Sequence, residues 1–397
     1  MRFASRGGGA LLLAGLAGAV GAGAPSTRTI DLIVRETAGI RRTEYPVGTI
    51  LALPRGVVAD LERVRLSRNG SEVPAQFTAA GTWEDGSVSQ LAVDWNATLG
   101  PAESQTYQFE HGNDVTAVAR PRTALTVVES EQGVQVGNVR FGPTGWPLLA
   151  SIGYRGEIVG PGGNGLVIVD AAGARHDFGS ARTVALEVLK RGPLVAAIRY
   201  TARVPIDATS DVRATVTCEM PNSKSWVKLT ASIEGGRQQI RAVRFETPLS
   251  LGAYPWTWDF ATDSGTYGAF RAPADVAMLT QTVAPAGNRW RVETGTASAS
   301  QIYEQSLPGR AATAAGWGHL LDGRNAIAFA IDGFGSTPGS YVVSLNGQGQ
   351  AAFEIALARP ANAARLVVFQ HFVSTPVPIG AATSPFSMVN PLRVDVK

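Results

Sequence analysis

The stretch Ile198-Arg199-Tyr200-Thr201-Ala202-Arg203-Val204 decides the fold class of this sequence. Apolar or small side chains alternate in it with polar ones, so that one face carries Ile198, Tyr200 and Val204 and the other carries both arginines. Successive side chains of a β-strand point to opposite faces, and a strand with one buried face therefore shows a period of two. The stretch predicts a half-buried strand.

Similar runs rich in Val, Ile, Thr and aromatic residues recur along the chain, with turn residues between them. Asn69-Gly70 stands between two such runs, and Asp85-Gly86 and Asn346-Gly347 each follow one. Asn-Gly and Asp-Gly accept the positive φ that tight hairpin turns require. No amphipathic helical pattern is long enough to predict a substantial helix. We therefore predict an all-β protein with less than about 10 % helix.

Length, composition and charge limit the classes of protein to consider. The 397 residues exceed the usual size of one domain, so two domains are expected, with one large all-β unit as the alternative. Hydrophobic residues make up 45 %, which is enough for a core and excludes a disordered chain. The 35 basic and 32 acidic residues form no Lys/Arg run, so we expect no nucleic-acid partner.

Residues 1–24 have the pattern of a secretory signal peptide. Arg2 and Arg6 precede a short apolar stretch, Ala10–Val20, and Ala22-Gly23-Ala24 supplies small residues for cleavage. This stretch is too short to cross a bilayer, and no later segment is long and apolar enough, so no membrane span is expected. The sequence predicts a periplasmic or secreted protein. Its one cysteine, Cys218, rules out an internal disulfide and is interpreted as a buried strand thiol.

A domain boundary is predicted between residues 112 and 122. Gly112-Asn113-Asp114 ends a strand, and Arg120-Pro121-Arg122 has the composition of a linker. The expected organisation is a signal peptide over 1–24, a small barrel or sandwich over 25–118 and a large unit over 119–397. The last unit is too long for a simple sandwich, which indicates a many-stranded double sheet.

Three groups of motifs resemble a known family. The first two lie in residues 35–95 and the third lies in residues 316–324. The motifs are Arg35-Glu36 with Ala38-Gly39-Ile40, Arg42, Tyr45-Pro46-Val47 and Leu53-Pro54-Arg55-Gly56; Val73-Pro74-Ala75-Gln76-Phe77 with Thr82–Val88 and Leu91–Trp95; and Gly316–Arg324. Together they resemble the PcRGLX/YetA-like proteins, which include exo-rhamnogalacturonan lyases.

The resemblance implies a fold and an activity. It implies a RIFT-barrel N-terminal domain, a central β-sandwich, and β-elimination of a pectic or uronic-acid polysaccharide. The sequence departs from the family in two ways. An α/α toroid domain is not expected in these 397 residues, and Asp332-Gly333-Phe334-Gly335 stands where the family has Arg-Asp-Phe-Trp. The alternatives are a non-catalytic polysaccharide-binding protein and an accessory or structural subunit whose missing domain comes from a partner chain.

Eliminative cleavage of a uronide sets requirements for the catalytic residues. A cation or donor must stabilise charge on the carboxylate, a base must remove the C5 proton, and an acid must protonate the leaving oxygen. A lone histidine on an apolar face is more often a core residue, so a structural interpretation stays open for each candidate. The candidate catalytic residues are His319, Arg324, Tyr303 and His371.

Aromatic and acidic side chains supply the candidate substrate-binding residues. The densest aromatic cluster is Tyr254–Phe260, where alternation places the four aromatic rings on one face. Such a face can stack on sugar rings or plug the core. The ligand is expected to be an acidic polysaccharide or oligosaccharide. No His/Cys metal spacing or phosphate-binding loop occurs, so neither a metal nor a cofactor is expected. The candidates are Trp256, Trp258, Trp317 and Asp322.

Overall fold

The computed structural model describes residues 28–153, 157–235, 239–307, 312–373 and 383–397. The predicted signal segment 1–24 lies outside these residues. Strands account for 61 % of the structure and helix for 3 %, which confirms the all-β prediction. In the described ranges, no helix has the length and apolar character needed to span a bilayer.

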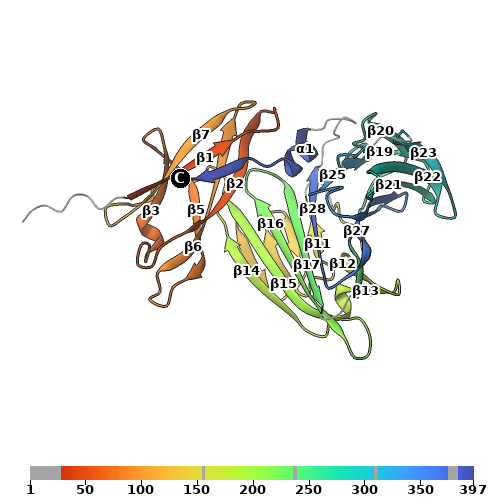
Figure 1. Cartoon of the computed structure of the whole chain (residues 1–397), viewed down its shortest axis with the longest axis horizontal. Coiled ribbons are helices and arrows are strands. Elements are labelled where there is room, and N and C mark those ends of the chain that lie inside the picture. The colour runs from red at the N-terminus through yellow and green to blue at the C-terminus, as the bar shows by residue number, and fades with distance from the viewer. Residues whose placement is uncertain (1–27, 154–156, 236–238, 308–311, 374–382) are drawn as a thin grey trace, which may run out of the picture.

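The N-terminal unit consists of two small sheets with a shared core (Figure 1). A five-stranded sheet has the order β29-β1-β7-β3-β4 and a three-stranded sheet has the order β2-β6-β5. Leu32, Phe109 and Val93 lie in the core between them and are inaccessible to solvent. The strands are β1 (Arg28–Arg35), β2 (Arg42–Ala52), β3 (Val64–Arg68), β4 (Ser71–Val73), β5 (Ala75–Thr82), β6 (Val88–Leu99), β7 (Ser104–His111) and β29 (Arg393–Val396).

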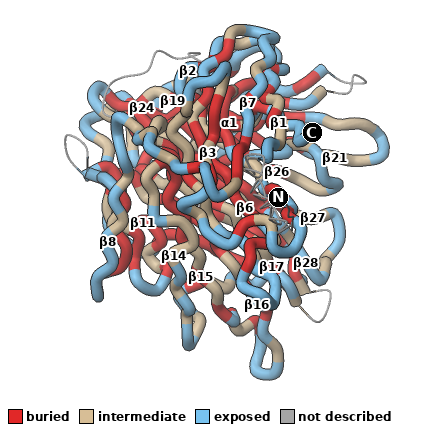
Figure 2. Tube along the Cα trace, turned by 90° about the vertical axis from the view of Figure 1, so that its left-hand side faces the viewer, coloured by how far each residue is buried: buried red, intermediate tan, exposed pale blue. Residues whose placement is uncertain are grey.

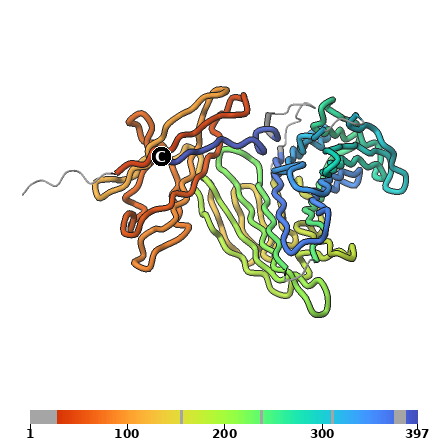
Figure 3. Tube along the Cα trace, viewed as in Figure 1, coloured from red at the N-terminus to blue at the C-terminus, as the bar shows by residue number. Residues whose placement is uncertain are grey.

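The C-terminal strand belongs to this N-terminal unit, which differs from the expected division into 25–118 and 119–397. β29 pairs antiparallel with β1, from Leu32 opposite Val396 to Arg35 opposite Arg393. In Figure 3 the last, dark-blue part of the chain runs back to the red and orange unit. β29 supplies backbone partners for one edge of β1, which would otherwise be open. Because the partner strands are separated by most of the chain, the sequence pattern did not reveal this pairing.

The large unit contains three sheets within the described residues. A four-stranded sheet, order β11-β10-β9-β8, accompanies an eight-stranded and a nine-stranded sheet. Its strands are β8 (Val127–Ser130), β9 (Gly133–Val136), β10 (Val139–Phe141) and β11 (Leu149–Ile152). The eight-stranded sheet runs, in order, β13 (Arg175–Asp177), β12 (Gly165–Asp170), β18 (Ile240–Pro248), β27 (Gln350–Ala361), β26 (Gly339–Asn346), β21 (Asp275–Val283), β22 (Arg289–Thr296) and β23 (Ala299–Gln305).

The nine-stranded sheet packs against the eight-stranded sheet. Phe329 and Phe353, one from each sheet, place their ring centroids 5.2 Å apart in the shared core. One short helix, α1 (Thr383–Val389), packs against β25 and β24 of this sheet. The strands are, in order, β14 (Val184–Arg191), β15 (Val195–Pro205), β16 (Asp211–Pro221), β17 (Trp226–Gly235), β28 (Ala363–Val373), β25 (Ala326–Ile331), β24 (Trp317–Leu321), β19 (Trp256–Phe260) and β20 (Thr266–Phe270).

The strand and turn predictions from the sequence are confirmed at the residue level. In β15, Ile198, Tyr200 and Val204 are buried, whereas Arg203 is exposed. Asn69 and Gly70, with φ of 51° and 76°, form the turn between β3 and β4. Figure 2 shows how burial is distributed over the described residues: buried segments lie centrally, and the ends of hairpins are exposed. Cys218 is buried in β16, and burial raises the pKa of its thiol.

Buried polar contacts fix the N-terminal unit against the nine-stranded sheet. The Gln76 side chain accepts from the backbone N–H groups of Leu194 and Val195, at 2.8 and 2.9 Å, and donates to the Val195 carbonyl at 2.9 Å. Lys190 Nζ lies 2.8 and 2.7 Å from the two carboxylate oxygens of Asp94. These directional contacts hold the junction in one arrangement, so cavities at the junction are preformed.

Candidate functional site

The linker between the two units is anchored at both ends. The backbone N–H groups of Val118 and Ala119 donate to Glu72 Oε1 at 2.7 and 2.8 Å. At the other end, Asn222 Nδ2 donates to the Thr123 carbonyl at 2.6 Å. Between these anchors lies Arg120-Pro121-Arg122, in which the proline fixes its own φ and favours an extended residue before it. The anchors therefore fix the backbone of the linker, from which the exposed side chains of Arg120 and Arg122 extend.

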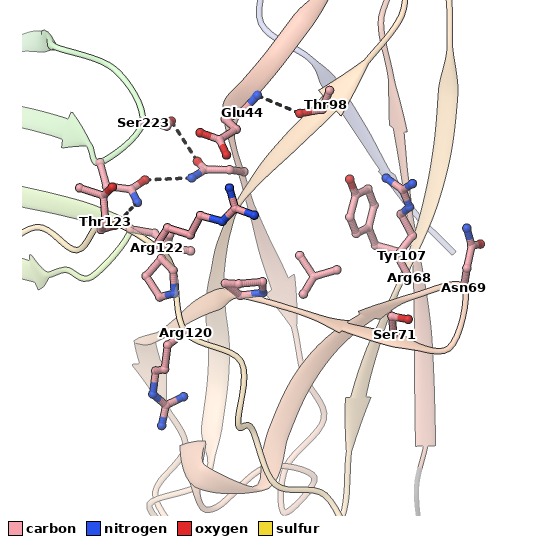
Figure 4. Close-up of a pocket in the computed structure, with 16 residues that line it drawn as sticks. Glu44, Arg68, Asn69, Ser71, Thr98, Tyr107, Arg120, Arg122, Thr123 and Ser223 are labelled. Carbon is pink, nitrogen blue, oxygen red and sulfur yellow. Dashed lines mark hydrogen bonds between the residues drawn. The ribbon is translucent and has the colours of Figure 1, made fainter.

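These arginines line a cavity of about 960 Å³ at the junction of the two units (Figure 4). We call it the arginine pocket. Its walls come from the β3–β4 hairpin, β2, β6, β7, the linker and the β16–β17 turn. The lining residues are Glu44, Arg68, Asn69, Ser71, Val73, Pro74, Asn96, Thr98, Tyr107, Arg120, Pro121, Arg122, Thr123, Leu194, Asn222 and Ser223.

Arg68, Arg120 and Arg122 form no ion pair among the described residues, although Glu103 lies near Arg68 and Glu44 lies near Arg122. Arg68 Nη1 donates to the amide oxygen of Gln105 at 2.6 Å, and Arg120 Nη1 donates to the Ala119 carbonyl at 3.2 Å. Over the described ranges, no carboxylate lies within the 4.0 Å of an ion pair from Arg68, Arg120 or Arg122. Figure 4 shows the Arg122 side chain reaching from the linker toward Glu44, the one carboxylate among the lining residues.

Tyr107 forms a rigid part of the pocket wall. Its side chain is buried, its hydroxyl donates to Gln105 Oε1 at 3.0 Å, and the Arg68 guanidinium lies 5.9 Å from its ring centroid. Burial raises the pKa of Tyr107, and the nearby Arg68 only partly opposes this effect. The phenol therefore stays protonated at neutral pH.

The remaining polar lining consists of neutral amides and hydroxyls. Asn96 Nδ2 donates to Asn222 Oδ1 at 2.9 Å, and Ser223 Oγ donates to Asn96 Oδ1 at 3.1 Å. These bonds tie β6 to the β16–β17 turn and fix the back of the pocket. Guanidinium groups recognise carboxylates through paired N–H donors, and amides and hydroxyls suit the hydroxyls of a ligand.

The sequence-predicted residue His319 lies deep in the protein. Its Nδ1 is 2.8 Å from Asp259 Oδ1, and the two side chains are only 1 % and 6 % exposed. β24, which carries His319, has β25 on one side and β19 on the other, and α1 covers part of it. The His319–Asp259 pair is thus buried among the neighbouring strands and α1, and it is not accessible to a ligand from solvent.

The other candidates in Gly316–Arg324 do not converge on a ligand site. The Asp322 carboxylate is buried and accepts hydrogen bonds from the backbone N–H groups of Gly252, Arg324 and Asn325. Trp317 is 9 % exposed and packs in the core that includes the N-terminal unit. Arg324 is exposed to solvent. In the structure, Asp322 therefore caps a turn and Trp317 packs in the core, and neither side chain faces a ligand site.

The predicted aromatic platform faces the core. Trp256 and Trp258 are 6 % and 2 % exposed, so neither ring offers a face to a sugar, contrary to the hypothesis of a stacking site. Phe260 is buried on the same side of β19, as the alternation predicts. Tyr303 is 56 % exposed on the edge strand β23, far in sequence from the arginine pocket, and its hydroxyl donates to the Tyr267 carbonyl at 3.3 Å.

His371 differs from these residues because it borders a cavity. It lies on β28 in one cross-strand row with His319, with Ala328 between them. Its Nε2 is 2.7 Å from Ser225 Oγ, and both residues line a cavity of about 460 Å³.

The described part of the chain contains no group of three or more His, Cys, Asp or Glu side chains that could hold a metal ion.

The arginine pocket was not among the sequence-predicted sites. The only signal in the sequence is the string Arg120-Pro121-Arg122, whose composition is that of a linker. Its other walls come from residues around 44, 70, 96 and 222, and no local pattern connects these segments.

Comparisons with known proteins identify the fold. No family model and no curated protein matches the sequence. An α-mannosidase from Enterococcus faecalis V583 has a similar structure, with a TM-score of 0.54 and 9 % identity over 93 % of this chain and 46 % of that chain. A protein in the glycosyl hydrolase family 38 from Enterococcus faecalis has a TM-score of 0.52 and 9 % identity, over 93 % of this chain and 47 % of that chain. The chain thus spans just under half the length of these two structures. At this identity the similarity shows a shared fold.

Proposed function

We propose that the protein binds an anionic saccharide, of the uronic-acid-containing kind, in the arginine pocket. The observation that carries this proposal is Arg122, which reaches from the anchored linker along the arginine pocket and forms no ion pair among the described residues, with Arg120 exposed nearby on the same linker. A carboxylate can take two parallel N–H bonds from one guanidinium, a geometry that lysine does not offer. The volume of about 960 Å³ lies at the upper end of the usual range for ligand sites, ~300–1,000 Å³.

Two further observations support a saccharide over other anions. Two proteins of similar structure are an α-mannosidase and a member of glycosyl hydrolase family 38, and both names describe enzymes that act on carbohydrates. The motif resemblance to the PcRGLX/YetA-like proteins independently suggests a rhamnogalacturonan-type ligand. The proposal takes the protein to be exported, as residues 1–24 predict, since such polysaccharides lie outside the cytoplasm.

Binding fits the pocket better than β-elimination does. Arg122 can neutralise a uronate carboxylate, but the lining residues in the described part of the chain include neither His nor Lys to remove the C5 proton. Tyr107 is buried and protonated, and Glu44 is the one carboxylate among the described lining residues. Lyase activity is therefore the second candidate, and ultraviolet absorbance of an unsaturated product on pectic substrates would reveal it.

The test is the affinity of arginine variants for an acidic oligosaccharide. Arg120→Ala and Arg122→Ala should each weaken binding of oligogalacturonides about 10- to 150-fold, because a hydrogen bond to a charged group contributes about 1.5–3 kcal/mol. Isothermal titration at fixed ionic strength measures the effect. Arg289→Ala, an exposed arginine at the start of β22, is the control that removes the same charge elsewhere.

Two results would contradict the proposal. One is unchanged affinity in both pocket variants. The other is equal binding of a neutral polysaccharide such as galactan, because the arginines would then have no part in recognition.

A further inference from the structure

Ser225 and His371 form a partly buried hydrogen-bonded pair at the nine-stranded sheet. Ser225 precedes β17, and His371 lies on the neighbouring strand β28, opposite Trp226. Ser225 Oγ and His371 Nε2 are 2.7 Å apart. The Trp226 ring stands at 89° to the imidazole with centroids 6.5 Å apart, and this packing restricts the orientation of the imidazole.

The geometry is that of a nucleophile and its base. A serine hydroxyl becomes a useful nucleophile when an adjacent imidazole accepts its proton. With its proton on Nδ1, the neutral imidazole of His371 accepts a hydrogen bond from Ser225 through Nε2. Burial, together with the charges of His319 and Lys224, lowers the pKa of His371 to about 4. The ring is therefore neutral near pH 7, the form in which Nε2 can accept a hydrogen bond from Ser225.

The pair opens into a cavity with two kinds of wall. The volume is about 460 Å³. Leu125, Val139 and Met220 give one side apolar character, which suits a short acyl chain, and Lys224 contributes a positive charge. Lys224 Nζ donates to the Thr43 carbonyl at 2.8 Å, which fixes the ammonium group in place.

This cavity adjoins the arginine pocket. Thr123, Asn222 and Ser223 line both. A saccharide that fills the arginine pocket would thus contact residues that also line the cavity of Ser225.

We propose that Ser225 and His371 are a catalytic pair that hydrolyses a short carboxylic ester, and that the natural ester is an O-acetyl group on an acidic saccharide. The first part stands on the Ser–His geometry and its cavity. The second part rests on the proposed function, because it needs the saccharide to occupy the arginine pocket.

The reaction balances with water as the only co-reactant. Ser225 Oγ forms a bond to the acyl carbon while its proton passes to His371 Nε2. The bond from the acyl carbon to the alcohol oxygen breaks, and the imidazolium returns the proton to that oxygen. Water then attacks the acyl-serine with His371 as base, which releases the carboxylic acid and restores the serine.

The first experiment measures hydrolysis of p-nitrophenyl acetate, which does not require saccharide binding. Ser225→Ala should lower kcat/KM by at least about 100-fold, because the nucleophile is lost. Ser232→Ala, on β17 and outside both cavities, should keep the wild-type rate. An organophosphonate probe should label wild-type protein at Ser225, as mass spectrometry of its peptides can show.

Absence of hydrolysis by the wild type, full activity of Ser225→Ala, or labelling at another serine would overturn the catalytic pair. The pH profile gives a further readout. The rate should fall as pH drops through about 4, where His371 becomes protonated. A profile that is flat down to pH 3 would contradict the role of His371 as the base.

The second experiment tests the natural ester. Acetate release by the wild type should be at least about tenfold faster from acetylated polygalacturonate than from an acetylated neutral galactan. Equal rates would overturn the saccharide part of the inference and leave the ester chemistry standing. Failure of p-nitrophenyl acetate hydrolysis alongside tight oligogalacturonide binding would instead overturn the catalytic pair and leave the proposed function standing.

Discussion

Arg42→Met is expected to lower the free energy of unfolding by about 3–5 kcal/mol. Arg42 and Glu36 are an ion pair whose side chains are 1 % and 0 % exposed, with Nη2 and Oε1 3.2 Å apart. Arg42 also donates to the carbonyls of Ser387 and Asn390, so it connects the N-terminal unit to α1 and the residues after it. The variant leaves a buried carboxylate without its cation and removes the donor to both carbonyls.

Equilibrium denaturation of the variant and of a matched control measures the effect. Arg35→Ala breaks the exposed Arg35–Asp395 pair, whose side chains are 47 % and 54 % exposed, and should cost less than about 1 kcal/mol. If the two variants lose similar amounts, the buried pair does not hold the junction as described.

The same pair makes stability depend on pH. Burial by itself would raise the pKa of Glu36, but backbone N–H groups of Ala102, Ala38 and Gly39, with Arg42, lower it overall. A carboxyl with a lower pKa in the folded state stabilises the protein above its unfolded pKa. This contribution should disappear as the pH falls through the folded pKa.

His319→Ala is expected to destabilise the protein by about 3–5 kcal/mol, whereas Arg324→Ala should change stability by less than about 0.5 kcal/mol. The His319 imidazole accompanies a buried carboxylate, Asp259, at 2.8 Å, and its removal also leaves a cavity. Arg324 is exposed at a turn.

Thermal and chemical unfolding of both variants, measured together with oligogalacturonide binding, separates a structural role from a ligand-binding one. A His319→Ala variant with wild-type stability and lost binding would return the Gly316–Arg324 segment to the candidate sites. Lost stability with binding retained in the folded fraction would support a structural role.

The parts of the fold that the sequence could predict are local. Alternation in Ile198–Val204 sets strand faces, and Asn69-Gly70 sets a hairpin, because both depend on residues close in the chain. β29 could not be predicted, since its pairing with β1 joins the two ends of the described chain.

The candidate sites show the same difference between local features, which the sequence predicts, and contacts between distant residues, which it does not. Gly316–Arg324 contains several polar and aromatic side chains, but β24 is an inner strand of its sheet and α1 packs against it. Trp317 and His319 are therefore buried, and Asp322 accepts backbone hydrogen bonds in the turn. Ser225 and His371 are 146 positions apart, and the arginine pocket draws on segments from Glu44 to Ser223. Tertiary structure alone brings such residues together.

A crystal structure of the protein with an oligogalacturonide tests the central claim most directly. We expect a sugar carboxylate within hydrogen-bond distance of the Arg122 or Arg120 guanidinium, in the cavity between the linker and the β3–β4 hairpin. An ordered oligosaccharide bound elsewhere, with only water at these arginines, would contradict it.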